Sequence, residues 1–94
     1  MNNIREVVIS CIRDISPEAA NTEIKDDSDP ELDLCLNSLM GVELASEFKT
    51  RLGIEIEISD NPLVCTDPTT GSRRLRNIGE IVSYLSTLQK GGIQ

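Results

Sequence analysis

The chain has 94 residues, enough for one small domain (residues 1–94), and 16 acidic against 9 basic side chains give a formal net charge of −7. Histidine is absent, which excludes Ser-His-Asp and Cys-His catalysis and most zinc sites. An enzyme is not excluded, but its usual catalytic groups are missing, and we expect no metal site. Nine acidic residues between Glu18 and Glu47 stand against one base, Lys25. This balance argues against nucleic-acid binding and favours partners with basic surfaces, although an acidic face kept for solubility explains it equally well.

The amino-terminal residues and the cysteines bear on the cellular compartment. The opening residues are polar and lack the apolar core of a signal peptide, and no apolar run reaches membrane-spanning length. Cys11, Cys35 and Cys65 are odd in number and widely spaced, which predicts reduced thiols rather than a disulfide framework. We therefore expect a soluble, cytoplasmic protein without stable membrane insertion.

An amphipathic helix opens the chain. Apolar residues recur at helical spacing over residues 4–15. Ser16-Pro17 ends the pattern, because the residue before a proline is pushed out of the helical region. With Phe48 and Tyr84 as the only aromatic residues, the core that this helix enters is expected to be aliphatic.

A long loop is predicted over residues 17–36. Leu32, Leu34 and Leu36 alternate near its end and are expected to enter the core. The alternating acidic residues before them suggest a calcium loop. However, Leu32 stands where an EF-hand requires glycine, and Ser38 stands where it requires the bidentate glutamate, so we do not expect calcium binding.

A second helix is predicted over residues 38–52, and Gly53 is positioned to end it. Its expected apolar stripe comprises Leu39, Val42, Ala45, Phe48 and Leu52, widened by Leu44. Gly41 costs about 1 kcal/mol relative to alanine near the first turn, and the close approach of a partner or prosthetic group is one explanation. An extended segment follows, with Ile54, Ile56 and Ile58 pointing inward.

A short helical turn is expected around residues 61–65. Arg73, Arg74 and Arg76 make one basic cluster in an acidic chain, either a partner or phosphate contact or a solvated loop edge. A last amphipathic helix follows over residues 78–88. Together these elements, with no usable strand pair, predict an all-α fold: a small four-helix bundle (three main helices plus one short helix) with a long first loop.

The polar pair Asn37-Ser38 interrupts an apolar run where the second helix should begin. Both residue types are favoured at helix starts, because a side-chain oxygen can accept a hydrogen bond from a free backbone N–H group. The same position favours anions, since free N–H groups and the positive end of the helix dipole converge there. The pair is therefore either a simple helix cap or a place where a phosphate attached to Ser38 is stabilised.

Four short motifs follow one another along the chain: Asp33-Leu34-Cys35-Leu36-Asn37-Ser38-Leu39, then Val42-Glu43-Leu44, then Gly53-Ile54-Glu55-Ile56, then the closing helix that starts at Ile78. Their order and spacing resemble the acyl carrier protein family, whose pattern is Asp-Leu-Gly-x-Asp-Ser-Leu, Val-Glu-Leu and Gly-Ile-Glu-Ile before a last helix. The resemblance covers roughly residues 4–58 and 77–88.

The resemblance implies a carrier that catalyses nothing itself. Ser38 is the implied site where a phosphopantetheinyl transferase attaches 4′-phosphopantetheine from coenzyme A, and the thiol of that arm carries an acyl group as a thioester. The implied partners are this transferase and acyl-activating, ketosynthase or acyltransferase enzymes, which act on a monomeric carrier. The residues implied to recognise partners are Asn37, Leu39, Met40, Glu43 and Glu47.

Several positions depart from the family pattern. They are Cys35 for glycine, Asn37 for aspartate, Met40 for an acidic residue, and Lys49 and Arg51 on a helix that is typically acidic. The segment between Ile58 and Asn77 is also longer than in ordinary fatty-acid carriers. We therefore expect a specialised carrier in fatty-acid, lipid or polyketide biosynthesis. The alternatives are an unmodified carrier-like interaction module and a free-standing peptidyl carrier protein.

Overall fold

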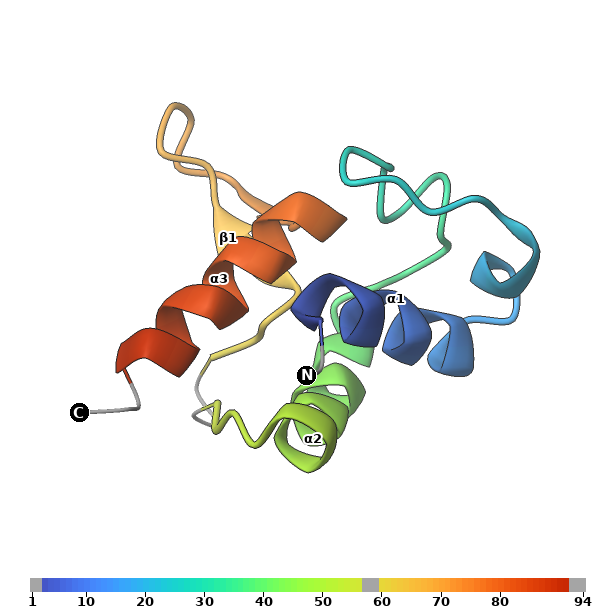
Figure 1. Ribbon diagram of the computed structural model, residues 1–94. Coiled ribbons are helices and arrows are strands. Elements are labelled where there is room, and N and C mark those ends of the chain that lie inside the picture. The colour runs from blue at the N-terminus through green and yellow to red at the C-terminus, as the bar shows by residue number, and fades with distance from the viewer. Residues whose placement is uncertain (1–2, 57–59, 92–94) are drawn as a thin grey trace.

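The computed structural model describes residues 3–56 and 60–91, and within these ranges three helices build most of the fold (Figure 1). They are α1 (Ile4–Ile15), α2 (Met40–Leu52) and α3 (Ile78–Gly91), accompanied by one 3-10 turn, η1 (Ala19–Asn21), and two short strands, β1 (Val64–Thr66) and β2 (Arg73–Leu75). The helix α1 packs against both α2 and α3. The prediction of a mostly helical domain is confirmed. None of the helices in the described ranges has the length and apolar character needed to cross a membrane.

The helix α1 has the predicted bounds because both of its ends are determined locally. The Asn3 side chain accepts hydrogen bonds from the backbone N–H groups of Arg5 (2.9 Å) and Glu6 (3.4 Å). At the other end, Ser16 leaves the helix in an extended conformation before Pro17. The buried Ser16 hydroxyl then donates a 2.8 Å hydrogen bond to a carbonyl of the long loop, which ties that loop to the end of α1.

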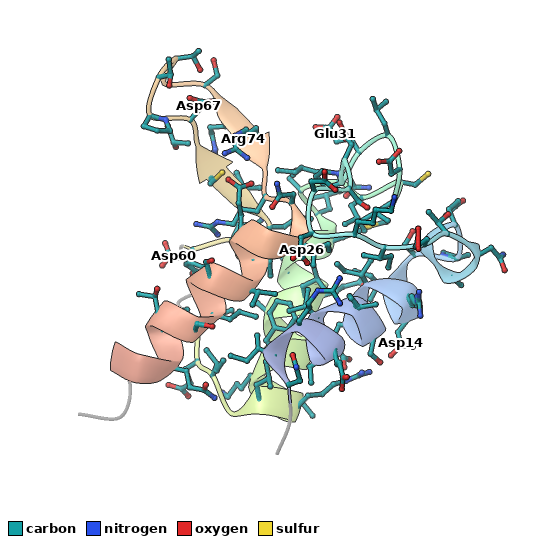
Figure 2. The ribbon with its side chains drawn as sticks, turned by 45° about the horizontal axis from the view of Figure 1, so that its top comes forward. Asp14, Asp26, Glu31, Asp60, Asp67 and Arg74 are labelled. Atoms are coloured by element: carbon teal, nitrogen blue, oxygen red, sulfur yellow. The ribbon has the colours of Figure 1, made fainter. Side chains whose placement is uncertain are left out.

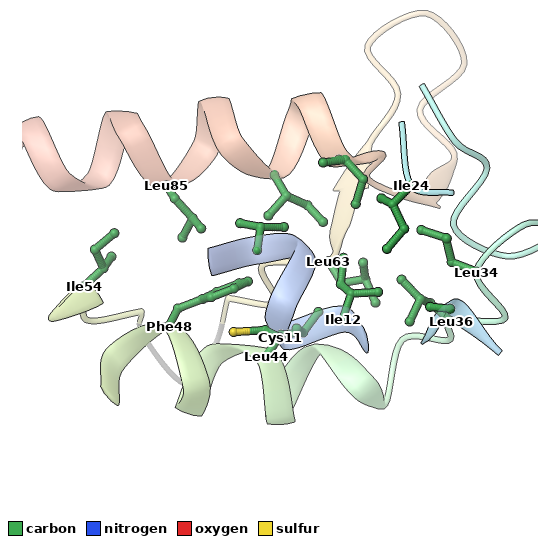
Figure 3. Close-up of a cluster of buried hydrophobic side chains, with 14 residues drawn as sticks. Cys11, Ile12, Ile24, Leu34, Leu36, Leu44, Phe48, Ile54, Leu63 and Leu85 are labelled. Carbon is green, nitrogen blue, oxygen red and sulfur yellow. The ribbon is translucent and has the colours of Figure 1, made fainter. Parts of the chain in front are cut away.

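The core gathers apolar side chains from the three helices and from the segments between them (Figure 3). Its buried members are Val8, Cys11, Ile12, Ala19, Ile24, Leu34, Leu36, Leu44, Phe48, Ile54, Leu63, Ile78, Ile81 and Leu85. Phe48 is the largest of them and is fully buried, whereas the others are aliphatic or small. The expected aliphatic core is therefore confirmed, with one phenylalanine inside it.

The predicted apolar stripe of α2 is wrong at its start. Leu39 is 79% exposed and Val42 is 71% exposed, while Gly41, Leu44 and Phe48 form the buried face. These three residues have the i, i+3, i+7 spacing of one helix face. The sequence therefore predicted the helix correctly but assigned its buried face to the neighbouring row of residues in the first turns. Gly41 is part of this buried face, and its backbone lies against the side chain of Asn61.

The long loop enters the core at two of its three predicted leucines. Leu34 and Leu36 are buried, as expected, but Leu32 is 82% exposed. The Asp29 carboxylate accepts hydrogen bonds from the N–H groups of Glu31 and Leu32, both at 2.9 Å, and holds this part of the loop as a turn. The strand-like alternation therefore begins only after the turn, and Leu32 points to solvent.

A β-hairpin stands where a short helix was predicted around residues 61–65. The strands β1 and β2 are antiparallel, with Val64 opposite Leu75, Cys65 opposite Arg74 and Thr66 opposite Arg73. The Asp67 side chain accepts a 2.8 Å hydrogen bond from the N–H group of Thr69, and Gly71 closes the turn with φ 73°. Both the short helix and the absence of a strand pair were thus wrong, and the fold is mostly helical with a small sheet.

The segment after α2 follows its prediction in the described residues. Gly53 ends the helix with φ 69°, and its N–H group donates a 3.0 Å hydrogen bond to the carbonyl of Lys49. Ile54 is buried and Ile56 is half-buried, as an inward-facing extended segment requires. The third isoleucine of the pattern, Ile58, lies outside the described residues.

The hairpin is joined to α3 by an ion pair that makes stability depend on pH. The Arg74 guanidinium donates two hydrogen bonds, of 2.7 and 2.6 Å, to the carboxylate of Glu80. These bonds, helped by the N–H group of Asn77, lower the pKa of Glu80 from 4.5 to about 2. A carboxylate whose pKa falls on folding stabilises the folded state above its unfolded pKa, and this contribution is lost as the pH falls from about 4.5 toward 2.

We therefore expect Glu80→Gln to lower the free energy of unfolding at pH 7. Between pH 4.5 and 2 this free energy should decrease less in the variant than in the wild-type chain. Urea denaturation at a series of pH values measures both effects. Glu18→Gln, which removes an exposed carboxylate without an ion pair to any described residue, is the control. An unchanged pH dependence in Glu80→Gln would contradict the role of this pair.

Candidate functional site

The start of α2 is capped by Asn37 and not by Ser38. The side-chain oxygen Oδ1 of Asn37 accepts hydrogen bonds from the N–H groups of Leu39 (3.0 Å) and Met40 (3.3 Å). Ser38 and Leu39 form a tight turn, and the helix begins at Met40, two residues later than predicted. Of the two residues that the sequence offers as a cap, the geometry therefore selects Asn37.

Ser38 has a constrained backbone and an open side chain. Its carbonyl accepts hydrogen bonds from the N–H group of Gly41 (3.1 Å) and from Nδ2 of Asn61 (2.8 Å). Its side chain is exposed, and no described residue is hydrogen-bonded to the hydroxyl. This combination presents the hydroxyl to solvent from a backbone held by two hydrogen bonds, and a hydroxyl in this position is accessible to covalent modification.

Cys35 lies in the left-handed region of backbone conformation, with φ 55°. This region is favourable for glycine and costly for residues with a side chain. Position 35 is also where the acyl carrier pattern has its glycine. The loop before Ser38 therefore takes the conformation that glycine would supply, and the neighbouring Leu34 and Leu36 are buried to hold it.

Gly41 is explained by packing inside the chain, in place of the external group proposed from the sequence. A Cβ atom at this position would overlap the carboxamide of Asn61. That carboxamide donates to the carbonyl of Ser38 and accepts a 2.9 Å hydrogen bond from the N–H group of Leu63. Asn61 thereby connects the start of the hairpin segment to the turn that carries the serine, a role that nothing in its sequence context signals.

We expect Gly41→Ala to destabilise the fold by about 1 kcal/mol. Displacing Asn61 loses two hydrogen bonds, each contributing about 1 kcal/mol, and this loss outweighs the gain of about 1 kcal/mol from a better helix former. Chemical denaturation measures the net effect. In the Asn61→Ala background the clash is gone, so the same change should stabilise the protein. Destabilisation of equal size in both backgrounds would show that Asn61 is not the cause.

A groove with a volume of about 430 Å³ opens beside Ser38, between the long loop and the hairpin. It is lined by Glu31, Leu36, Asn37, Ser38, Val64, Arg73, Arg74 and Leu75. Figure 1 shows the hairpin and the loop projecting on the same side of the helices, and Figure 2 shows Arg74 on the hairpin and Glu31 on the loop. The hairpin wall was missed because residues 61–65 were taken for a helical turn, although two of the three residues of β1, Val64 and Thr66, are β-branched.

The three arginines of the predicted basic cluster have different surroundings. Arg74 is bound to Glu80, and its guanidinium also lies 3.7 Å from Asp67. Arg76 lies over the ring of Tyr84, at 4.0 Å from the centroid. Arg73 is exposed and makes no ion pair with any described residue. Of the three charges, only that of Arg73 faces the groove without a partner in the described chain.

The acidic pair predicted to recognise partners, Glu43 and Glu47, is split by the fold. Glu47 is half-buried and accepts a 2.9 Å hydrogen bond from Nε of Arg51, which also binds Asp14 on α1 at 2.5 Å. Glu43 is exposed and has no cationic partner among the described residues. Glu47 is therefore engaged within α2 by Arg51, and the bond from Arg51 to Asp14 holds α2 to α1. Glu43 is available at the surface.

The other residues predicted to contact partners gather around Ser38. Leu39 and Glu43 are exposed and Met40 is half-buried, and Val42 adds a further exposed apolar side chain beside them. Exposed large apolar side chains that cluster at one end of a helix are typical of a docking surface. Leu39 was assigned both to partner recognition and to the core, and its exposure contradicts the core assignment.

The cysteines and the acidic loop show no further site in the described residues. All three cysteines are free, and burial raises the pKa of the Cys11 thiol to about 11, which keeps it protonated at neutral pH. The residues 3–56 and 60–91 contain no group of three or more acidic or cysteine side chains placed to hold a metal ion.

Comparison of the chain with protein-family models, with curated protein sequences and with solved structures gave no match in any of the three. The resemblance to acyl carrier proteins therefore depends on the motifs themselves and on two local features of the structure. These features are the left-handed backbone at Cys35 and the Asn37 cap, which leaves the Ser38 hydroxyl unbonded within the described chain.

Proposed function

We propose that this chain is an acyl carrier that bears 4′-phosphopantetheine on Ser38 within a carrier-type helical bundle. The observation that carries the proposal is the exposed Ser38 hydroxyl, which is unbonded within the described chain and lies two residues before α2 begins, where Asn37 supplies the cap. A serine needed for capping would have its hydroxyl engaged. The cargo is an acyl group held as a thioester, in specialised fatty-acid, lipid or polyketide biosynthesis.

The chain contributes tethering and presentation. The Ser38 hydroxyl loses its proton and its oxygen forms a bond to the pantetheine-bearing phosphorus of coenzyme A, while the pyrophosphate P–O bond breaks and adenosine 3′,5′-bisphosphate leaves. The product is a phosphodiester, and the thiol at the far end of the arm carries the acyl group. A short tether raises the effective concentration of its cargo at a docked enzyme, to the millimolar range for flexible linkers. The surface formed by Leu39, Met40, Val42 and Glu43 lies around the attachment point, so a docked partner would meet the arm at its origin.

The direct test is incubation of the purified chain with coenzyme A and a promiscuous phosphopantetheinyl transferase. We expect the intact mass to rise by one phosphopantetheine, and fragmentation of the modified peptide should place the addition at Ser38. No addition with several such transferases would refute the proposal. Addition at another serine would refute the assignment of the site.

A second candidate is an interaction module that keeps the carrier-like fold and is never modified. It is favoured by Asn37, which lacks the charge usual in carriers, and by the exposed apolar Leu39 and Val42. This candidate requires Ser38→Ala to leave the function in the host intact, whereas a carrier would lose it. A free-standing peptidyl carrier differs from the main proposal only in its cargo, and the acidic charge and Gly53-Ile54-Glu55-Ile56 motif favour acyl groups.

The split acidic pair leads to different expectations for its two members. Glu43→Lys should slow modification by the transferase roughly tenfold at low ionic strength and less at high salt, because it reverses an exposed charge that attracts a basic partner. It should leave stability unchanged. Glu47→Lys should lower the unfolding midpoint in urea as well, since Arg51 loses its partner on α2.

Initial rates at two salt concentrations and urea denaturation measure these effects. Glu6→Lys, an exposed change on α1, is the matched control for net charge. Equal rates for Glu43→Lys and the control at low salt would contradict the role of Glu43 in docking.

A further inference from the structure

A phosphodiester on Ser38 would not find free backbone donors in the first turn of α2. Asn37 occupies the N–H groups of Leu39 and Met40. The N–H groups of Gly41 and Val42 donate to carbonyls of the preceding turn, at 3.1 and 3.3 Å. The free N–H groups expected from the sequence are therefore engaged, and the helix offers an anion only the positive end of its dipole. Any further stabilisation has to come from a side chain.

The groove beside Ser38 supplies a suitable side chain. Arg73 lines this groove, is exposed, and makes no ion pair with a described residue. Its neighbour Arg74 is neutralised by Glu80, so it adds little net charge to the groove. Arginine matches the geometry of phosphate oxygens with its planar array of donors, which makes it a preferred partner for phosphate groups.

The hairpin also gives the groove an apolar wall. Val64 and Leu75 are directly opposite each other in the register of β1 and β2, and both line the groove. Arg73 and Leu75 are two residues apart on β2, so they share one face of the strand. A ligand that lies along this face therefore meets a cation first and aliphatic side chains next.

We propose that this groove seats the phosphopantetheine arm of the same chain, with Arg73 pairing its phosphodiester and with Val64 and Leu75 contacting its methyl-bearing part. The inference rests on the proposed function. The volume of about 430 Å³ lies in the range of small-molecule sites, about 300 to 1,000 Å³. An arm attached at the edge of the groove is always close to it, so even a weak contact is populated.

Binding of the arm in this groove gives a role to the hairpin, which lies in the segment that is longer here than in ordinary carriers. The groove holds the unloaded or loaded arm on the hairpin side of Ser38, away from the exposed Leu39 and Glu43. An enzyme that docks on those residues draws the arm out of the groove by offering its phosphate a better site. Glu31, on the opposite wall, limits how strongly the groove retains an anion.

The test compares the apo and phosphopantetheinylated forms of the ¹⁵N-labelled full chain by NMR, with intact mass measured on each sample. We expect attachment to shift the amide resonances of residues 64–66 and 73–75 as well as those of 37–40. The side-chain Nε–H resonance of Arg73 should shift as well. In Arg73→Gln the hairpin shifts should be lost while those of residues 37–40 remain. Arg13→Gln, which removes an exposed arginine on α1 outside the groove, should retain the wild-type shifts.

The outcomes separate this inference from the function on which it rests. If no mass is added, both are wrong. If the mass is added and the shifts are confined to residues 37–40, the chain is a carrier but the groove does not seat the arm. If the hairpin shifts persist unchanged in Arg73→Gln, the pairing of Arg73 with the phosphodiester is wrong.

Discussion

The Ser38→Ala variant is expected to lose phosphopantetheine attachment completely while keeping the stability of the unmodified wild-type chain. No described residue is hydrogen-bonded to the hydroxyl, and the side chain is exposed, so its removal leaves no buried group unsatisfied. The free energy of unfolding should therefore change by no more than about 0.5 kcal/mol. Intact mass after treatment with coenzyme A and transferase measures the first effect, and urea denaturation measures the second.

Ser46→Ala is the matched control, because Ser46 is an exposed serine on α2, the helix that follows Ser38. It should be modified as fully as the wild-type chain. Residual modification of Ser38→Ala at the wild-type level would place the attachment elsewhere. A large loss of stability in Ser38→Ala would instead identify the hydroxyl as a structural group and restore the interpretation of a simple cap.

Phe48→Ala is expected to destabilise the fold by about 3 to 5 kcal/mol. Phe48 is 0% exposed and is the largest fully buried side chain of the core shown in Figure 3. Its truncation removes apolar contacts and leaves a cavity that the surrounding helices fill only in part. Small domains have total stabilities of about 5 to 15 kcal/mol, so this single change removes a large share and brings the variant close to unfolding.

Val42→Ala is the informative control for Phe48→Ala, since the sequence assigned both residues to the same buried stripe. Val42 is 71% exposed, and its truncation should change the free energy of unfolding by no more than about 0.5 kcal/mol. Urea denaturation of both variants measures the contrast. A loss of more than about 2 kcal/mol in Val42→Ala would mean that α2 buries the face originally predicted.

The face that α2 buries also decides which side chains surround Ser38. Because Gly41 faces inward, Leu39, Val42 and Glu43 are placed at the surface next to Ser38. The same arrangement brings Asn61 against the start of α2 and fixes the carbonyl of Ser38. The contact between Asn61 and the turn that carries Ser38 therefore depends on the absence of a side chain at position 41.

The features that the sequence by itself determined are those specified by neighbouring residues. The bounds of α1 follow from Asn3 and from Ser16-Pro17, and the end of α2 follows from Gly53, because caps and breakers act within one turn. The candidate serine was identified in the same way, since Asn37 and Ser38 stand at a helix start whatever the helix packs against. Local hydrogen bonds of this kind do not depend on distant parts of the chain.

The tertiary structure alone decided which of two neighbouring faces α2 buries, where the hairpin pairs, and what each charge contacts. The strands β1 and β2 are three residues each, too short to show a period, and they are stabilised by pairing across a turn that closes at Gly71. Arg74 is neutralised by Glu80, and Arg73 is left facing the groove, only because the hairpin packs beside α3 and the long loop. Such outcomes depend on packing between segments far apart in the chain, where small differences in buried area and ion pairing select one arrangement over another.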